Sequence, residues 1–251
     1  MSLLEALGIF AAGGAAGAIN VVVGSGTLIT FPVLLAFGFA PVTANVSNTI
    51  GLVPGSVSGA IGYRRELRGQ AGRALRLGSM SVLGGVTGAV LLLVLPASAF
   101  KAIVPVFIAI ALVLTVLQPR LARSLANREI DLQRPGHPLT ALAVFLTGVY
   151  GGYFGAAQGI ILLAILGVAL TQDLQRTNAL KNVLAGLVNG VAGVYFTIAA
   201  HVRWDAAGLI AAASIVGAQL GARYGRRLPP DALRGLIVLV GISAIVQLVL
   251  G

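Results

Sequence analysis

The sequence predicts an all-α protein that crosses a membrane many times and consists of two inverted repeats of about five membrane segments each. Three observations support this prediction: the composition, a series of apolar stretches of helical length, and an internal repeat. Of the 251 residues, 57% are hydrophobic and only 10% are charged. So few charges cannot cover the surface of a soluble protein of this size, and the lipid bilayer is the expected surrounding.

Ten apolar stretches follow one another along the chain. Most are close to the ~20 residues that a helix needs to span a bilayer. The stretches lie at 3–23, 27–39, 43–63, 75–95, 99–118, 139–156, 160–170, 177–199, 206–222 and 233–250. The second and the seventh are short, and each follows a glycine-rich break. We therefore expect a first transmembrane repeat at 1–118, a cytoplasmic linker at 119–138 and a second repeat at 139–251, joined in one membrane domain.

The seventeen basic residues outnumber the seven acidic ones and are unevenly placed. Fifteen of them fall in regions that back-and-forth threading of the segments places on one side: Arg64, Arg65, Arg68, Arg73, Arg76, Arg120, Arg123, Arg128, Arg134, Arg176, Lys181, Arg223, Arg226, Arg227 and Arg234. Because loops rich in Lys and Arg stay in the cytoplasm, this side is predicted to be cytoplasmic and both chain ends to lie outside it. Membrane orientation thus explains the positive charge, and no nucleic-acid partner is expected.

The two halves of the chain resemble each other at an offset of 133 or 134 residues. The paired residues include Gly14 and Gly148, Gly17 and Gly151, Thr43 and Thr177, Asn48 and Asn182, Gly84 and Gly217, and Gly88 and Gly221. With an odd number of segments in each half, the second half crosses the membrane in the opposite sense to the first. Inverted repeats with interrupted segments at matching positions build the midplane binding site of many alternating-access transporters.

Two breaks, Gly24-Ser25-Gly26 and the GAAQG stretch at 155–159, precede the short segments. Irregular backbone inside a bilayer needs protein or a wet cavity to satisfy its polar groups, so we expect the breaks to face each other across a substrate path. A helix that starts near Thr27 or Ile160 presents free N–H groups and a positive dipole end, which suits an anion. The expected substrate-binding residues of this symmetric anion cradle are Gly24, Ser25, Gly26, Thr27, Gln158 and Gly159.

Each half also carries a polar stripe on the segment after its short helix. These side chains share one face at a period of 3.6 residues, and polar groups inside a membrane usually face a partner helix or a cavity. The stripes contain Asn45, Asn48 and Thr49 in the first half and Asn178, Lys181, Asn182 and Asn189 in the second, all candidate substrate contacts. Bridging between helices explains Asn45 and Asn189 equally well. Lys181 either contacts the cargo or extends to the cytoplasmic interface.

Other small and aromatic residues have plainer explanations. Gly84, Gly88, Gly217 and Gly221 form GxxxG pairs, which predict close helix packing in both halves. Aromatic residues near segment ends are expected in the interfacial belt of the membrane: Tyr63, Tyr195, Trp204 and Tyr224.

The regions that carry these motifs resemble a known family. They are AGAINVVVGSGTLITFPVLLAFGFAPVTANVSNTIGLVPGSVSGAIGYRREL at 16–67, and GVYGGYFGAAQGIILLAILG at 148–167 with LQRTNALKNVLAGLVNGVAGVYF at 174–196. Nearly the whole chain resembles the sulfite exporter TauE/SafE family of bacterial membrane permeases. The resemblance implies a multi-pass protein of the bacterial inner membrane that transports sulfur-containing anions such as sulfite, sulfoacetate or thiosulfate, often outward. It leaves the individual anion open.

Several classes of function are disfavoured by what the sequence lacks. It has no cysteine, and His137 and His201 have no ligand spacing around them, so neither a metal nor a cofactor is expected. Ser25 has no base within a membrane segment, so an enzyme is not expected. Every Asp and Glu falls in a loop or at a segment end, which leaves no buried carboxylate as a proton relay. An anion channel or uncoupled facilitator is the alternative to a transporter, and the coupling ion, the direction and any homo-oligomer stay open.

Overall fold

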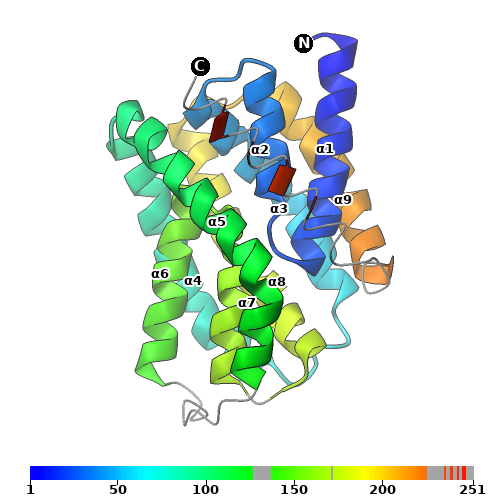
Figure 1. The fold of residues 1–251 in the computed structure, drawn as a ribbon, viewed down its shortest axis with the longest axis vertical. Coiled ribbons are helices and arrows are strands. Elements are labelled where there is room, and N and C mark those ends of the chain that lie inside the picture. Colours follow the sequence, from blue (N-terminus) through cyan, green and yellow to red (C-terminus); the bar gives the residue numbers. More distant parts are fainter. Residues whose placement is uncertain are drawn as a thin grey trace.

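The computed structural model describes residues 1–126, 137–170 and 172–224, together with isolated positions between 235 and 246. The regular structure in these residues is helical, which confirms the all-α prediction (Figure 1). The helices are α1 (Leu3–Val22), α2 (Thr27–Ala36), α3 (Pro41–Gly62), α4 (Ala71–Val94), α5 (Ala97–Ala126), α6 (Pro138–Tyr153), α7 (Gln158–Ala169), α8 (Leu174–Ala199) and α9 (Trp204–Tyr224). Most of the last apolar stretch, 233–250, and half of the linker, 127–136, lie outside the described residues.

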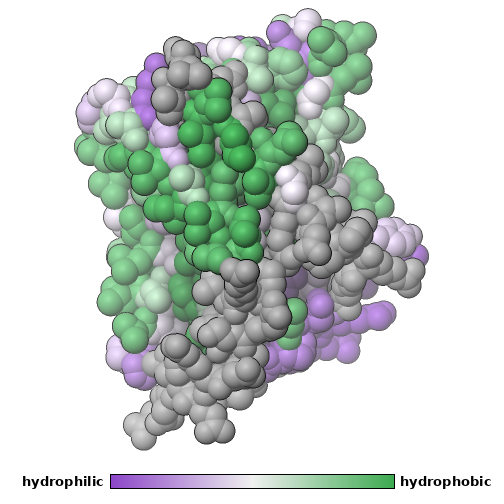
Figure 2. Space-filling view, in the orientation of Figure 1, coloured by the Kyte–Doolittle hydropathy of each residue, from purple (hydrophilic) through white to green (hydrophobic). Residues whose placement is uncertain are grey.

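Five of the described helices, α1, α4, α5, α8 and α9, are long and apolar enough to cross a membrane, and α2, α6 and α7 are shorter apolar helices. Large apolar side chains such as Leu83, Leu146 and Ile198 are exposed, and Figure 2 shows hydrophobic residues over much of the coloured surface. An apolar surface of this extent suits lipid rather than water. The helices and the surface together indicate a multi-pass membrane protein.

Helix α5 continues to Ala126, beyond the segment end expected at 118. The expected end was placed where the apolar stretch stops. Arginine is nevertheless a good helix former, so a change from apolar to basic residues does not by itself end a helix.

Helices α1 and α9 pack side by side and run in the same direction. A Cβ placed on Gly13 would lie 2.9 Å from the Cα of Ile210, and one placed on Gly221 would lie 2.6 Å from the carbonyl oxygen of Ala18. The numbers of the contacting residues therefore increase in the same direction along both helices, so the two helices are parallel. Helix α3 packs against α9 as well.

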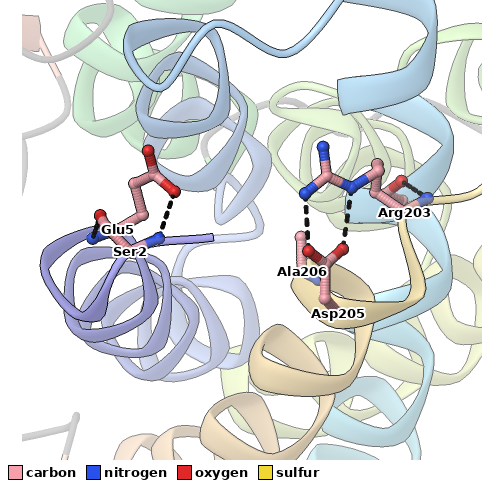
Figure 3. Close-up of polar contacts among 6 residues, drawn as sticks. Ser2, Glu5, Arg203, Asp205 and Ala206 are labelled. Carbon is pink, nitrogen blue, oxygen red and sulfur yellow. Dashed lines mark hydrogen bonds and ion pairs between the residues drawn. The ribbon is translucent and has the colours of Figure 1, made fainter.

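The starts of α1, α3 and α9 lie at one end of the bundle. The Ser2 hydroxyl accepts a hydrogen bond from the Glu5 N–H (3.2 Å) at the start of α1, and Arg203 pairs with Asp205 (2.6 Å) at the start of α9 (Figure 3). The backbone N–H of Arg203 also donates to the hydroxyl of Ser47 in α3 (3.0 Å). Asp205, the acidic partner of Arg203, thus lies at this end of the bundle.

The opposite end carries basic loops. The Arg176 guanidinium donates to the carbonyl of Arg68 (3.0 Å), and the Gln70 amide donates to the carbonyl of Arg176 (3.0 Å). Arg73 donates to Gln172 (3.0 Å). The loop after α3 and the start of α8 therefore meet, so the two groups of basic residues share one end of the molecule.

The two predicted breaks end their helices in the same way. Helix α1 ends before Gly24 (φ +88°), whose N–H and that of the preceding residue both donate to the carbonyl of Ile19 (3.0 and 2.7 Å). Helix α6 ends before Gly155 (φ +77°), whose N–H and that of the preceding residue both donate to the carbonyl of Tyr150 (3.1 and 2.9 Å). A left-handed glycine after the last turn is a common helix stop, because glycine has no Cβ to strain this conformation.

The four GxxxG glycines pack against neighbouring helices, as predicted. A Cβ added to Gly217 would lie 2.0 Å from the carbonyl oxygen of Gly14, and one added to Gly221 would lie 2.6 Å from that of Ala18. A Cβ added to Gly84 would lie 2.2 Å from the carbonyl oxygen of Phe145, and one added to Gly88 would lie 2.0 Å from that of Val149. These separations are far shorter than any real carbon–oxygen contact. The backbones of α1 and α9, and of α4 and α6, meet at these points.

Gly217→Ala is expected to destabilise the protein by about 1–3 kcal/mol, because its methyl group forces α1 and α9 apart. The matched control is Gly208→Ala on the same helix, where nothing lies within 4 Å of the added carbon. That change is expected to stabilise by about 0.5–1 kcal/mol, the usual gain of alanine over glycine in a helix. Thermal unfolding in detergent measures both, and equal effects would contradict the contact.

Tyr63 does not lie in an interfacial belt, contrary to expectation. Its side chain is 1% exposed and belongs to a buried cluster with Val21, Ala179 and Ala218. The loop after α3 meets the start of α8, so the end of α3 is covered by protein rather than by headgroups. Trp204, by contrast, is well exposed, as a belt residue should be.

Candidate functional site

The two breaks meet directly inside the bundle. The N–H of Gly159 donates to the carbonyl of Gly24 (3.0 Å). A Cβ on Gly24 would lie 2.4 Å from the Cα of Gly159, and a Cβ on Gly159 would lie 2.4 Å from the Cα of Gly24. The breaks therefore face each other as expected, but they touch at these glycines instead of leaving a gap.

The start of α2 keeps hydrogen-bond donors without partners. Helix α2 begins at Thr27, as predicted, and the backbone amides of Ser25, Gly26 and Thr27 make no hydrogen bond to any part of the chain that the structure describes. The Ser25 hydroxyl is also unpartnered, although the residue is only 1% exposed. Buried donors without partners cost free energy, so this helix end is suited to receive an acceptor from outside the chain.

The start of α7 matches that of α2 in part: the amides of Ala156 and Ala157, like those of Ser25 and Gly26, make no hydrogen bond within the described residues, whereas the amides at the predicted helix start are occupied. Helix α7 begins at Gln158 rather than near Ile160. The amides of Gln158, Gly159 and Ile160 already donate to the carbonyls of Gly155, Gly24 and Ala157. They are occupied because the break folds back on itself and against the other break.

The second break also contributes a side chain. The Gln158 side chain is 3% exposed, its Nε2 has no partner, and it packs against Gly151. The preceding residue, Ala157, has a left-handed backbone (φ +58°). Such a conformation costs a residue with a Cβ about 1–2 kcal/mol. Strain of this kind persists where the surrounding structure enforces it, often at functional sites.

Lys181 lies at the junction of the breaks. Its side chain is 0% exposed, and its Nζ donates to the carbonyls of Asn20 (3.0 Å) and Val21 (3.2 Å) in the last turn of α1. A Cβ on Gly159 would lie 3.1 Å from its Cδ. The alternative that Lys181 extends to the cytoplasmic interface is therefore wrong, because carbonyls at the negative end of the α1 dipole hold it inside.

Asparagines cap the helix end in front of each break. Asn178 and Asn182 of α8 both donate to the carbonyl of Val21 (3.1 and 3.3 Å). Asn45 of α3 donates to the carbonyl of Tyr153 at the end of α6 (3.0 Å). Asn45 thus bridges helices, one of the two roles expected for it. The Oδ1 atoms of Asn45 and Asn178 are buried without a partner.

The remaining stripe residues divide into two groups. Asn48 joins the site: its Nδ2 donates to the hydroxyl of Thr27 (3.3 Å) and its Oδ1 accepts from that of Thr30. Asn189 instead donates to Ser56 of α3 (3.4 Å), which bridges the two stripe helices. Thr49 bonds within its own helix, to the carbonyl of Asn45 (2.9 Å).

Sequence reasoning missed Thr30 and an aromatic cluster. Thr30 is one turn from Thr27, and that helical spacing could have revealed it. Phe31 packs edge-to-face on Phe154, which directly precedes the second break (5.1 Å between ring centroids), and on Phe100 of α5 (6.4 Å). Buried phenylalanines are common in any apolar helix, so the sequence offered no signal that these rings pack together.

Comparison with known proteins places this chain in a family. A protein of Sinorhizobium sp. described as "Probable membrane transporter protein ORF9" is 30% identical over 244 residues, which cover 96% of this chain and 90% of that protein. "Probable membrane transporter protein YfcA" of Escherichia coli (strain K12) is 29% identical over 232 residues, 90% of this chain and 82% of that protein. No solved structure matches the chain. The profile of the family described as "Sulfite exporter TauE/SafE" matches residues 9–248. This membrane transporter chain therefore belongs to the sulfite exporter TauE/SafE family.

Proposed function

We propose that the protein carries small anions across the membrane, sulfur-containing ones such as sulfite, sulfoacetate or thiosulfate, by alternating access at the junction of the two breaks. The observation that carries this proposal is the fully buried Lys181, whose amino group lies where the breaks meet. Close by, the start of α2 offers free amides and the unpartnered Ser25 hydroxyl. A lysine and a helix N-terminus are both favourable partners for an anion.

The family name supports a sulfur oxyanion as the substrate. Sulfite and sulfonate groups present several acceptor oxygens on one small centre. The donors left free at the site, Ser25 Oγ, Gln158 Nε2 and the α2 amides, match such a cluster of acceptors in chemistry. Hydrogen bonds to a charged acceptor are about twice as strong as those between neutral groups.

An inverted repeat is the proposed architecture, and matched helix contacts support it. Gly217 packs on Gly14, and Gly84 packs on Gly148. Each residue of the first pair is related to one of the second by the sequence offset of 133 or 134. α1 with α9 and α6 with α4 are accordingly equivalent helix pairs in the two halves.

A contact between equivalent residues supports the same architecture. Ser56 and Asn189 are related by the offset of 133 residues, one less than the offset that pairs Asn48 with Asn182 on the same helices, and they bond to each other across α3 and α8 (3.4 Å). Two equivalent residues touch only near the axis that relates the repeats. Alternating access then consists of motion of one repeat against the other around this axis.

The burial of the site favours a carrier over an open channel. Ser25, Gln158 and Lys181 are 1%, 3% and 0% exposed. The test is counterflow into proteoliposomes that contain the purified protein. A carrier saturates and is stimulated by anion on the opposite side, whereas an anion channel or uncoupled facilitator that stays open shows no such stimulation.

The substrate is tested by thermal unfolding with sulfite, thiosulfate, sulfoacetate, sulfate and taurine, with chloride as the control. A ligand that binds only the folded state raises its stability in proportion to RT ln(1 + [L]/Kd). We expect a sulfur oxyanion to stabilise the protein and to be transported. Neither stabilisation nor flux with any of these anions would contradict the proposal.

We also propose that the protein lies in the bacterial inner membrane with the basic loops in the cytoplasm and both ends outside it. The chain has no cysteine, so single cysteines can be introduced without a background. Gly72→Cys in the basic region and His201→Cys at the opposite end are both at exposed positions. In whole cells an impermeant maleimide is expected to label position 201 and not position 72. The reverse pattern would overturn the orientation.

A further inference from the structure

The broken end of α1 gathers oxygen atoms that suit a cation. The carbonyls of Asn20 and Val21 stand in the last turn, at the negative end of the helix dipole. The Oδ1 of Asn178 is buried without a partner, while its amide donates to Val21. Backbone carbonyls at broken helix ends are the groups with which many transporters coordinate Na⁺, and carbonyl oxygens are good ligands for hard cations.

Lys181 occupies the position that such a cation would take. Its Nζ lies 3.0 Å from the Asn20 oxygen and 3.2 Å from the Val21 oxygen. The side chain is fully buried and reaches these oxygens from α8, past Gly159 at the start of α7. Among the described residues, the partners of Nζ are thus backbone carbonyls. Carbonyls of this kind also coordinate bound metal ions.

The first half of the chain has no counterpart to this charge. Asn45 and Asn178 are equivalent at the offset of 133, and each donates to a carbonyl at the end of the helix before a break. At the same offset Asn48 is equivalent to Lys181, and at the offset of 134 it is equivalent to Asn182. Asn48 makes neutral hydrogen bonds with Thr27 and Thr30 of α2, whereas Lys181 places an amino group on α1. The capping asparagines Asn45 and Asn178 thus match, and only the second half adds an amino group at the helix end that its asparagine caps.

We propose that Lys181 is a tethered cation: it fills, with its own amino group, a cation site formed by the broken end of α1, so the protein works without Na⁺. Removal of the side chain converts the same oxygens into a site for a free monovalent cation. That transport needs no Na⁺ rests on the proposed function, whereas the cation site at the end of α1 does not.

The test compares thermal unfolding of the purified chain in sodium chloride, choline chloride and ethylammonium chloride at equal ionic strength. The wild-type protein is expected to unfold at the same temperature in all three salts, because its site is filled. Lys181→Ala is expected to unfold several degrees lower in choline chloride and to recover in sodium or ethylammonium chloride, since these small cations can enter the vacated space and choline is too large.

Two variants serve as controls. Lys101→Ala removes the other lysine of the chain, which is exposed on α5, and is expected to show no response to the cation. Lys181→Arg keeps a tethered charge and is expected, like the wild type, to unfold at the same temperature in all three salts. Unfolding of Lys181→Ala at one temperature in all three salts would overturn the proposal, as would a wild-type protein that sodium specifically stabilises.

A second measurement does not depend on the folding of Lys181→Ala. Anion flux by the wild-type protein into proteoliposomes is expected to be equal with sodium and with choline as the only cation. A requirement for sodium overturns the tethered cation. A protein that passes the unfolding test but moves none of the tested anions contradicts the proposed function and leaves the cation site standing.

Discussion

Lys181→Met is expected to raise the apparent dissociation constant for the transported anion by roughly 10- to 150-fold, which corresponds to the loss of about 1.5–3 kcal/mol. Methionine fills a similar volume but supplies no charge and no N–H donor. The lysine is fully buried, so water cannot replace its charge at the site. The measurement is a titration of the anion selected by the thermal screen, followed by flux in proteoliposomes.

Lys101→Met is the matched control for this prediction. Lys101 is exposed near the start of α5, where solvent and salt screen its charge. Its replacement is expected to leave the dissociation constant and the flux unchanged. If Lys181→Met binds the anion as tightly as the wild-type protein, the lysine only holds the end of α1 and takes no part in binding.

The positions of the breaks were predictable from the sequence because local chemistry determines them. A glycine in an apolar stretch of helical length stops the helix when it adopts a positive φ, as Gly24 and Gly155 do. The start of α2 at Thr27 followed from this. The close packing at Gly217 and Gly88 was also predictable, since small residues at a spacing of four leave one helix face open to a neighbour.

The use of each donor could not be predicted, because tertiary contacts decide it. The Gly159 amide is taken by the carbonyl of Gly24, a residue far away in sequence. Lys181 is held by the carbonyls of Asn20 and Val21, and every residue carries such a carbonyl, so no side-chain pattern marks them. The same reason explains why the amides of Gln158 and Gly159 are occupied while that of Thr27 is free.

Under the proposed function, the two breaks contribute different side chains to anion binding. Both breaks offer free backbone amides, and the first adds the Ser25 hydroxyl while the second adds the Gln158 side chain, with Lys181 beside it. Ser25 and Gln158 are therefore the two positions where side-chain changes separate binding from folding.

The double substitution Ser25→Ala with Gln158→Leu is expected to abolish measurable anion flux while it leaves the protein as stable as the wild type, or more stable. Each substitution removes a hydrogen bond to a charged ligand worth about 1.5–3 kcal/mol, so the pair weakens binding by roughly two to four orders of magnitude. Neither Ser25 Oγ nor Gln158 Nε2 has a partner in the structure. Loss of a buried polar group without a partner does not break a contact within the protein and removes a cost of about 1–3 kcal/mol.

Ser81→Ala is the matched control, because Ser81 is equally buried on α4 and its hydroxyl is also unpartnered. It is expected to change stability in the same direction and to leave binding and flux intact. Thermal unfolding and proteoliposome flux on the same preparations separate the two effects. A double variant that is less stable and still transports would assign Ser25 and Gln158 to packing, and the two breaks would then serve to let α1 and α7 cross closely. A double variant that is stable and inactive, beside an active Ser81→Ala, places the anion between the two breaks.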